Sequence, residues 1–260
     1  MRIAVIGNSH LGHMAEPARA AADPVGASVD FFIERTYGTA GLGVRDAGGD
    51  VVRMPSIRLV AEADAGTVVD VEAYDAFVVV AFGISAISLV DAAQKYQRDT
   101  YRGWLPQFIL SEAMFREYLD AVMERTKGFR LLRLLRERTD KPIWLIPQPY
   151  PLAWAAEREG DKFARYADLR AAGEQGRVRA DFEAQLGRLA GIGVQIFHQP
   201  EETMEDTCFT RPEYGLADPA DAGEGSFYVR GDFYHMNKRF GEAVMDPLLL
   251  KGVLPGGDRL

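Results

Sequence analysis

Five short apolar runs along the chain have the character of buried parallel strands. Each is rich in β-branched or aromatic residues and is bounded by turn or polar residues. Continuous apolar runs, as opposed to alternating ones, suit strands that are covered by helices on both faces of a sheet. The predicted strands are Ile3–Ile6, Val29–Ile33, Ala76–Ala81, Pro142–Ile146 and Val194–Phe197.

Segments with helical periodicity separate most of these runs. The alternation of strand and helix predicts an open, doubly wound α/β fold. No internal repeat and no low-complexity linker marks a boundary, so residues 1–260 are expected to form one domain. The predicted helices are Ala15–Ala22, Ser111–Lys127, Gly128–Arg138 and Asp161–Leu189.

Two insertions break the alternation. The stretch Gly43–Asp70 lacks helical periodicity and contains the turn-like runs Asp46–Asp50 and Ala63–Gly66. It predicts one or two β-hairpins between the second and third strands. The second insertion, Gln94–Arg125, contains an irregular aromatic segment around Trp104, which is either a lid or wall of a substrate site or part of the packing. Apolar residues that follow it share one helical face: Met114, Phe115, Tyr118, Leu119, Val122 and Met123.

The composition is that of an ordinary globular protein, and the net charge disfavours some classes of binding partner. Apolar residues make up 47% of the 260 residues and charged residues 26%. The formal net charge is −8, which disfavours nucleic acid and anionic membrane surfaces as partners. No apolar stretch approaches the roughly 20 residues that span a bilayer, and the N-terminal apolar run is too short for a signal-peptide core. The sequence therefore predicts a cytoplasmic protein.

The single cysteine, Cys208, excludes an intramolecular disulfide. Its neighbours Glu205 and Asp206 are acidic and are expected to raise the pKa of the thiol. Cys208 is therefore not a candidate nucleophile.

The loop after the first strand is the first candidate for chemistry. In an open parallel sheet, ligands bind beyond the carboxyl ends of the strands, where Ser9 is predicted to lie. Ser9 has three interpretations. It is the N-cap of the next helix, part of a phosphate-binding loop, or a nucleophile that needs a base elsewhere. The glycine patterns of dinucleotide and phosphate loops are missing here.

The base candidate lies near the other end of the chain. Asp232 and His235 are three residues apart, so on a single helical turn both side chains share a face. The carboxylate then accepts a hydrogen bond from one ring nitrogen and leaves the other for a serine. The alternative is a surface turn followed by a helix. His198 is a weaker candidate base, because no acidic residue stands at a suitable spacing in the sequence.

Metal binding is an alternative role for three of the four histidines. His10, His13 and His235 are possible ligands, but Glu16 is the one acidic residue near the first two. No metal and no cofactor are therefore expected.

At both ends the chain resembles the SGNH (GDSL-like) hydrolases. The resemblance rests on Gly7-Asn8-Ser9 and on Asp232-x-x-His235-x-Asn237, with Gly241 completing an H-x-N-x-x-x-G pattern. It implies a flavodoxin-like three-layer sandwich with a five-stranded parallel sheet. By position, Ser9 matches the family's nucleophile, Asp232 its triad acid and His235 its base.

The resemblance also implies an oxyanion hole and shows two departures. Asn8 replaces the family's aspartate at a mainly structural position, and Ser85 stands where the family has an oxyanion asparagine. The implied hole uses Ser9, Gly38 (or Gly41), Gly83 and Ser85. Candidate substrate contacts are Asn8, His10, Trp104 and Tyr150.

The sequence thus predicts an esterase or deacetylase that acts on a small-molecule or saccharide ester through an acyl-enzyme on Ser9. An acyltransferase using the same triad is one alternative. A non-catalytic protein that binds a saccharide or acyl ligand is another, and the Ser85 departure favours it. A nucleotide-binding protein that uses the glycine cluster Gly38–Gly43 is a third.

Overall fold

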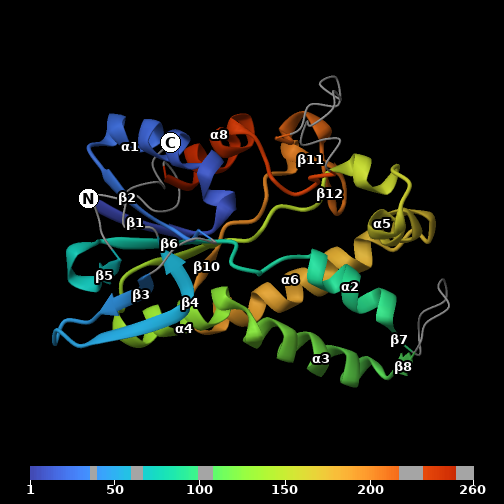
Figure 1. Cartoon of the computed structure of the whole chain (residues 1–260), viewed down its shortest axis with the longest axis horizontal. Coiled ribbons are helices and arrows are strands. Elements are labelled where there is room, and N and C mark those ends of the chain that lie inside the picture. Colours follow the sequence, from blue (N-terminus) through green and yellow to red (C-terminus); the bar gives the residue numbers. More distant parts are fainter. Residues whose placement is uncertain (36–39, 60–66, 99–107, 217–230, 250–260) are drawn as a thin grey trace.

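A five-stranded parallel sheet forms the centre of the computed structural model, which describes residues 1–35, 40–59, 67–98, 108–216 and 231–249. All four pairings are parallel, and the strand order is β2-β1-β6-β9-β10 (Figure 1). In chain order this is 2-1-3-4-5, the flavodoxin-like arrangement, so the predicted fold class is confirmed. The strands are β1 (Arg2–Gly7), β2 (Ser28–Ile33), β6 (Ala76–Val80), β9 (Ile143–Ile146) and β10 (Gln195–Ile196).

Helices cover both faces of this sheet. In Figure 1, α1 and α8 lie together above it, while α4 and α6 lie below. The helices are α1 (Ala15–Ala22), α2 (Ile87–Lys95), α3 (Glu112–Arg125), α4 (Lys127–Arg138), α5 (Asp161–Ala171), α6 (Gln175–Gly191) and α8 (Lys238–Pro247). Short 3-10 turns are η1 (Ser9–His13), η2 (Asp23–Val25), η3 (Val71–Ala73), η4 (Ala153–Ala156), η5 (Glu201–Thr203) and η6 (Pro212–Tyr214).

One predicted helical segment is divided in two. The sequence predicts continuous helix over Asp161–Leu189, but α5 ends before α6 begins at Gln175. Gly173 lies between them with φ +69°, in the left-handed region where a glycine readily ends a helix. The prediction of one continuous helix was wrong because Gly173 redirects the backbone, in a polar stretch, residues 173–177, that interrupts the apolar pattern.

The first insertion forms a small second sheet. Strands β3 (Ala40–Arg45) and β4 (Val51–Leu59) make an antiparallel hairpin, and β5 (Val68–Asp70) pairs with β3 in parallel. The turn is fixed by Asp46, whose Oδ1 accepts a hydrogen bond from the N–H of Asp50 at 2.9 Å. The predicted hairpin is therefore confirmed, and the second turn-like run, 63–66, lies outside the described residues.

The second insertion is largely helical, as expected. Between α2 and α3, strands β7 (Tyr96–Arg98) and β8 (Phe108–Leu110) pair in parallel. On α3 the buried row is Phe115, Leu119 and Met123, at four-residue spacing. The sequence placed Met114 on the same face, but its side chain is 55% exposed. Met114 precedes the buried Phe115 by one residue, and successive side chains point about 100° apart around a helix. A further hairpin, β11 (Met204–Asp206) and β12 (Phe209–Thr210), follows β10.

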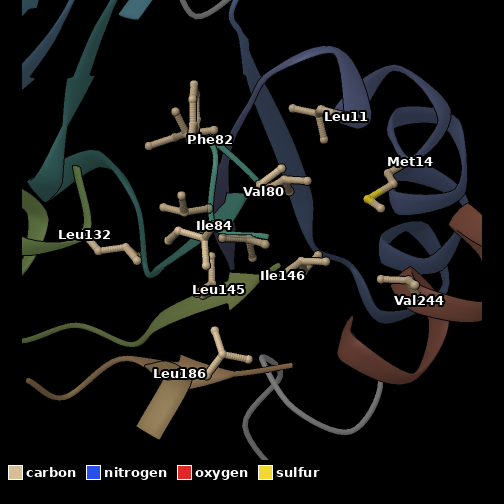
Figure 2. Close-up of a cluster of buried hydrophobic side chains, with 14 of the residues drawn as sticks. Leu11, Met14, Val80, Phe82, Ile84, Leu132, Leu145, Ile146, Leu186 and Val244 are labelled. Atoms are coloured by element: carbon tan, nitrogen blue, oxygen red, sulfur yellow. The ribbon is translucent and has the colours of Figure 1, made fainter. Parts of the chain in front are cut away.

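The hydrophobic core fixes the loop after β1. Figure 2 places Leu11 and Met14 near Val80, on the side of the sheet where Val244 of α8 lies. Leu11 is fully buried, and a Cβ on Gly7 would lie 2.9 Å from its Cβ. The absence of a side chain at Gly7 therefore lets this loop fold tightly onto the sheet edge. Across the ranges that the structure describes, no helix combines the length and apolar character needed to cross a membrane.

Candidate active site

Ser9 lies at the carboxyl edge of the sheet, two residues beyond the point where Gly7 pairs with Val80. The N-cap of η1 is Asn8, whose Oδ1 accepts a hydrogen bond from the N–H of His10 at 3.2 Å. The interpretation of Ser9 as the helix cap is therefore wrong. Because Asn8 caps the turn, the hydroxyl of Ser9 is available for another partner.

The structure brings Ser9, His235 and Asp232 together, although Ser9 and His235 are 226 positions apart. Ser9 Oγ lies 2.9 Å from His235 Nε2, and His235 Nδ1 lies 2.8 Å from Asp232 Oδ2. The His235 and Asp232 side chains are 20% and 12% exposed. This is an unbroken hydrogen-bonded path from hydroxyl to carboxylate, with the imidazole between them.

The backbone that carries Asp232 and His235 is not the helical turn that the spacing suggested. Asp232 Oδ1 accepts hydrogen bonds from the N–H groups of Tyr234 at 3.3 Å and His235 at 3.1 Å. An aspartate that binds the backbone just ahead of it makes an Asx-type turn, which competes with helix. The prediction of a helical turn was wrong because this local bond wins. One carboxylate thus holds both the turn and the histidine ring.

Phe233 anchors this turn in the core. It is buried, and its ring lies 5.2 Å from that of Tyr166 and 5.6 Å from that of Phe163. Its carbonyl accepts a hydrogen bond from the N–H of Leu152 at 2.7 Å. Phe233, the first of the two residues between the acid and the base, is therefore held by both its side chain and its backbone.

Helix α8 begins directly after the histidine. Asn237 is its N-cap and accepts a hydrogen bond from the N–H of Phe240 at 3.2 Å. The amide of Asn237 also donates to the carbonyls of Glu213 at 2.8 Å and Gly215 at 3.1 Å. Asn237 therefore ties the His235 segment to the neighbouring loop.

Gly241 lets α8 approach the serine loop closely. A Cβ at this position would lie 2.3 Å from the carbonyl oxygen of His13, the last residue of η1. We expect Gly241→Ala to lower the free energy of unfolding by roughly 1–3 kcal/mol, as overpacking does. It should also displace Ser9 from His235, because η1 carries Ser9. Urea denaturation measures the first effect, and labelling of Ser9 with a fluorophosphonate probe measures the second.

The control is Gly187→Ala in α6, where an added Cβ meets nothing within 4 Å. Alanine has the higher helix propensity, so this variant should be as stable as the wild type or more so. Equal behaviour of the two variants would contradict the close approach at Gly241.

The electrostatics of the site are dominated by burial and by the histidines. His10 is 5% exposed, and its ring stacks on that of His235 with centroids 4.9 Å apart. Burial, and next the charge of His235, lowers the pKa of His10 to about 3. Burial and then His235 also lower the pKa of His13. Burial opposes ionisation of Asp232, but the hydrogen bonds from His235 and the backbone outweigh it and lower the pKa of this carboxyl.

The buried neutral His10 predicts acid sensitivity. Below its ordinary pKa of 6.5, the unfolded chain binds a proton at His10 that the folded chain does not bind until about pH 3. The free energy of unfolding therefore falls as the pH drops, by about 1.4 kcal/mol per pH unit from this group. From pH 7 to pH 5 this contribution is about 2 kcal/mol.

Urea denaturation at pH 7 and pH 5 measures this loss, with His10→Phe as the control because phenylalanine binds no proton. The difference between the two pH values should be smaller in the variant by about 2 kcal/mol. An identical loss in both proteins would contradict a neutral, buried His10.

Gly83, one of the oxyanion candidates, lies in a left-handed turn beside the serine loop. Gly83 (φ +84°) ends a run of three left-handed residues beyond β6, after Ala81 (φ +63°) and Phe82 (φ +51°). Non-glycine residues in this region are strained and cluster at functional sites. Because Gly7 pairs with Val80, this turn and the serine loop leave the same edge of the sheet side by side.

Ser85 has a local partner. It is 4% exposed, and its Oγ accepts a hydrogen bond from the N–H of Ile87, the first residue of α2. Its hydroxyl oxygen therefore serves the start of that helix. Two further candidates, Gly38 and Trp104, lie outside the described residues.

Tyr150 lies in a separate pocket. Its ring contacts that of Phe182 at 6.0 Å, and both residues line a small cavity of about 20 Å³ together with His198. Neither Ser9 nor His235 is among the described residues that line this cavity. Contact of Tyr150 with a substrate stays a prediction.

His198 has a partner that the sequence did not indicate. Its Nδ1 lies 2.9 Å from Oε2 of Glu183, which is on α6. The expectation that no carboxylate orients His198 was wrong, because the partner comes from another element and sequence spacing does not reveal it. His198 remains 52% exposed.

The cysteine and the possible metal ligands were also located in the described parts of the chain. Cys208 is buried, and burial followed by Asp206 raises the pKa of its thiol to about 12. Among the described residues, no group of three or more potential ligands is placed to hold a metal ion.

Fold and site together define an α/β protein of flavodoxin-like strand order with a Ser–His–Asp arrangement at the carboxyl edge of its sheet. No family model matches the sequence, and no curated protein matches it. Among solved structures, the chain is similar to the crystal structure of a DUF4886 family protein from Bacteroides uniformis. The identity is 10%, the TM-score is 0.42, and the alignment covers 96% of this chain and 82% of that chain.

Proposed function

We propose that this chain is a serine hydrolase that cleaves esters through an acyl-enzyme on Ser9, as its resemblance to the SGNH hydrolases implies. The observation that carries the proposal is the hydrogen-bonded path from Ser9 through His235 to Asp232. A helix cap or a surface turn requires neither of these two bonds.

The reaction proceeds in two halves. Ser9 Oγ attacks the ester carbonyl while His235 Nε2 takes the hydroxyl proton, and His235 then gives that proton to the leaving alcohol. Water attacks the acyl-enzyme in the second half, and His235 again takes a proton and returns it to Ser9. Asp232 keeps the Nδ1 proton in place and stabilises the imidazolium. The products are the free acid and the alcohol.

The proposed oxyanion donors are the backbone N–H groups of Ser9 and Gly83, with Gly38 as a further candidate. At position 85 the hydroxyl of Ser85 stands in place of the asparagine, so the side-chain amide donor of the family pattern is missing. Loss of one such donor costs about 10²–10³-fold in rate. We therefore expect slow turnover compared with a complete hole.

The proposed substrate is a small-molecule or saccharide ester, and the proposed location is the cytoplasm. An acyltransferase would use the same acyl-enzyme with an alcohol acceptor in place of water. The serine at position 85, where the family has an oxyanion asparagine, favours the second candidate function, a non-catalytic protein that binds a saccharide or acyl ligand.

Covalent labelling tests the proposal. A fluorophosphonate probe should label the wild-type protein at Ser9, as mapped by peptide mass spectrometry. Ser9→Ala and His235→Ala should both lose the label. Ser111→Ala is the matched control, since Ser111 caps α3 through a hydrogen bond from Met114 N–H and should leave labelling unchanged.

Two results would contradict the proposed hydrolase function. One is the absence of labelling together with a p-nitrophenyl acetate rate equal to that of Ser9→Ala. The other is label on a different residue. A labelled protein that transfers acetyl to an added alcohol faster than to water would be an acyltransferase, and measurable ATP binding without labelling would favour the nucleotide-binding alternative.

A further inference from the structure

The ring of His235 meets Ser9 at its Nε2 edge and a second histidine on its face. His10 follows Ser9 directly, and its ring is stacked on that of His235 at 4.9 Å with an interplanar angle of 25°. Tyr234 also contacts both rings, at 4.7 Å from His235 and 5.9 Å from His10. The flat face of the base is therefore covered by an aromatic partner.

A histidine is an unusual residue at this buried position. It is 5% exposed, and its Nδ1 is buried with no hydrogen-bond partner among the described residues. A buried polar atom without a partner costs folding free energy that an apolar side chain of the same shape would avoid. Packing alone therefore does not account for a histidine here.

The stack has a consequence when His235 takes the proton of Ser9. The protonated ring is a cation, and a cation beside an aromatic face is stabilised by the electrons of that face. A charged neighbour would repel it. His10 is neutral at ordinary pH because burial disfavours its charged form, so it offers the face without the repulsion.

We propose that His10 is a positioning residue for His235. Its neutral ring holds the imidazole in the orientation that joins Asp232 to Ser9, and it stabilises the protonated imidazole that forms during acyl transfer. This inference rests on the proposed serine hydrolase and deepens it. It also assigns His10 a role other than direct contact with the substrate, for which a 5% exposed side chain offers little surface.

The test compares two replacements of similar size, His10→Phe and His10→Leu. Phenylalanine keeps a flat aromatic face, whereas leucine fills the space without one. With p-nitrophenyl acetate, His10→Leu should lower kcat about tenfold at unchanged KM, the size of effect that a desolvated cation–π contact supports. His10→Phe should stay within about threefold of the wild type.

The outcomes separate this inference from the proposed function. If the wild type neither turns over the ester nor is labelled at Ser9, the hydrolase itself fails. If the wild type is active, three results overturn the role of His10. They are a leucine variant equal to the wild type, both variants impaired alike, and a raised KM with unchanged kcat, which would indicate substrate contact. Circular dichroism verifies folding, and His10→Met replaces the leucine variant if that one does not fold.

Discussion

Replacing Asp232 by asparagine is expected to lower ester turnover by about 10⁴-fold, the size of the loss seen when a triad aspartate becomes asparagine. Asp232 Oδ1 accepts two backbone hydrogen bonds, and Oδ2 faces His235 Nδ1. An asparagine that keeps the backbone bonds turns its NH₂ group toward Nδ1. The ring then holds its proton on Nε2, so it has no lone pair for the hydroxyl of Ser9.

Steady-state kinetics with p-nitrophenyl acetate measures this loss, and a circular dichroism spectrum tests whether the fold is kept. The matched control is Glu16→Gln, which removes a carboxylate paired with Lys238 next to the site. That carboxylate is largely exposed, and we expect wild-type activity from the variant. An asparagine variant within about tenfold of the wild type would show that Asp232 does not orient the base.

Replacing Phe233 by alanine is expected to lower both the stability and the turnover strongly. Removal of a buried phenylalanine costs about 3–5 kcal/mol in the free energy of unfolding. The lost ring contacts are those with Tyr166, Phe163 and Trp154. Because Phe233 lies between Asp232 and His235, we also expect turnover to fall more than the loss of folded protein explains.

Urea denaturation gives the stability, and kcat corrected for the folded fraction gives the local effect. Leu135→Ala is the control, because Leu135 is fully buried on α4 and its removal costs about 2–5 kcal/mol. The corrected kcat should be unchanged for Leu135→Ala and reduced for Phe233→Ala. Equal corrected values would mean that Phe233 supports the fold without positioning the site.

The middle of the central sheet could be predicted because β1, β6 and β9 are largely buried on both faces. Each is a continuous apolar run, such as the one over Ala76–Val80, which needs no tertiary information to be seen. The outer strands β2 and β10 are more exposed and contain Asp30 and Gln195. The division between α5 and α6 was missed although the sequence marks it. Residues 173–177 contain no apolar side chain and include Gly173 and Gly176, and Gly173 adopts a left-handed conformation there.

In the candidate site, too, residue spacing could be interpreted from the sequence, whereas contacts between distant residues could not. Spacing linked Asp232 to His235, and the serine loop suggested their partner, but the turn that joins them depends on hydrogen bonds to the backbone. The pair of His198 with Glu183 and the stack of His10 on His235 join side chains through space. Nothing in residue spacing encodes the stack, since 225 positions separate His10 from His235 by the difference of their numbers.

Because 226 positions separate Ser9 from His235, the site forms only when distant parts of the chain come together. A backbone cut in the exposed turn at Gly48–Gly49 would leave the proposed nucleophile on one fragment and its base on the other. Strands β1, β2 and β3 would stay with the first fragment and the remaining strands with the second, so the halves would rejoin through the pairings of β1 with β6 and of β3 with β4 and β5. Ester hydrolysis on mixing the two fragments would then report their association, and the protein would serve as a split reporter.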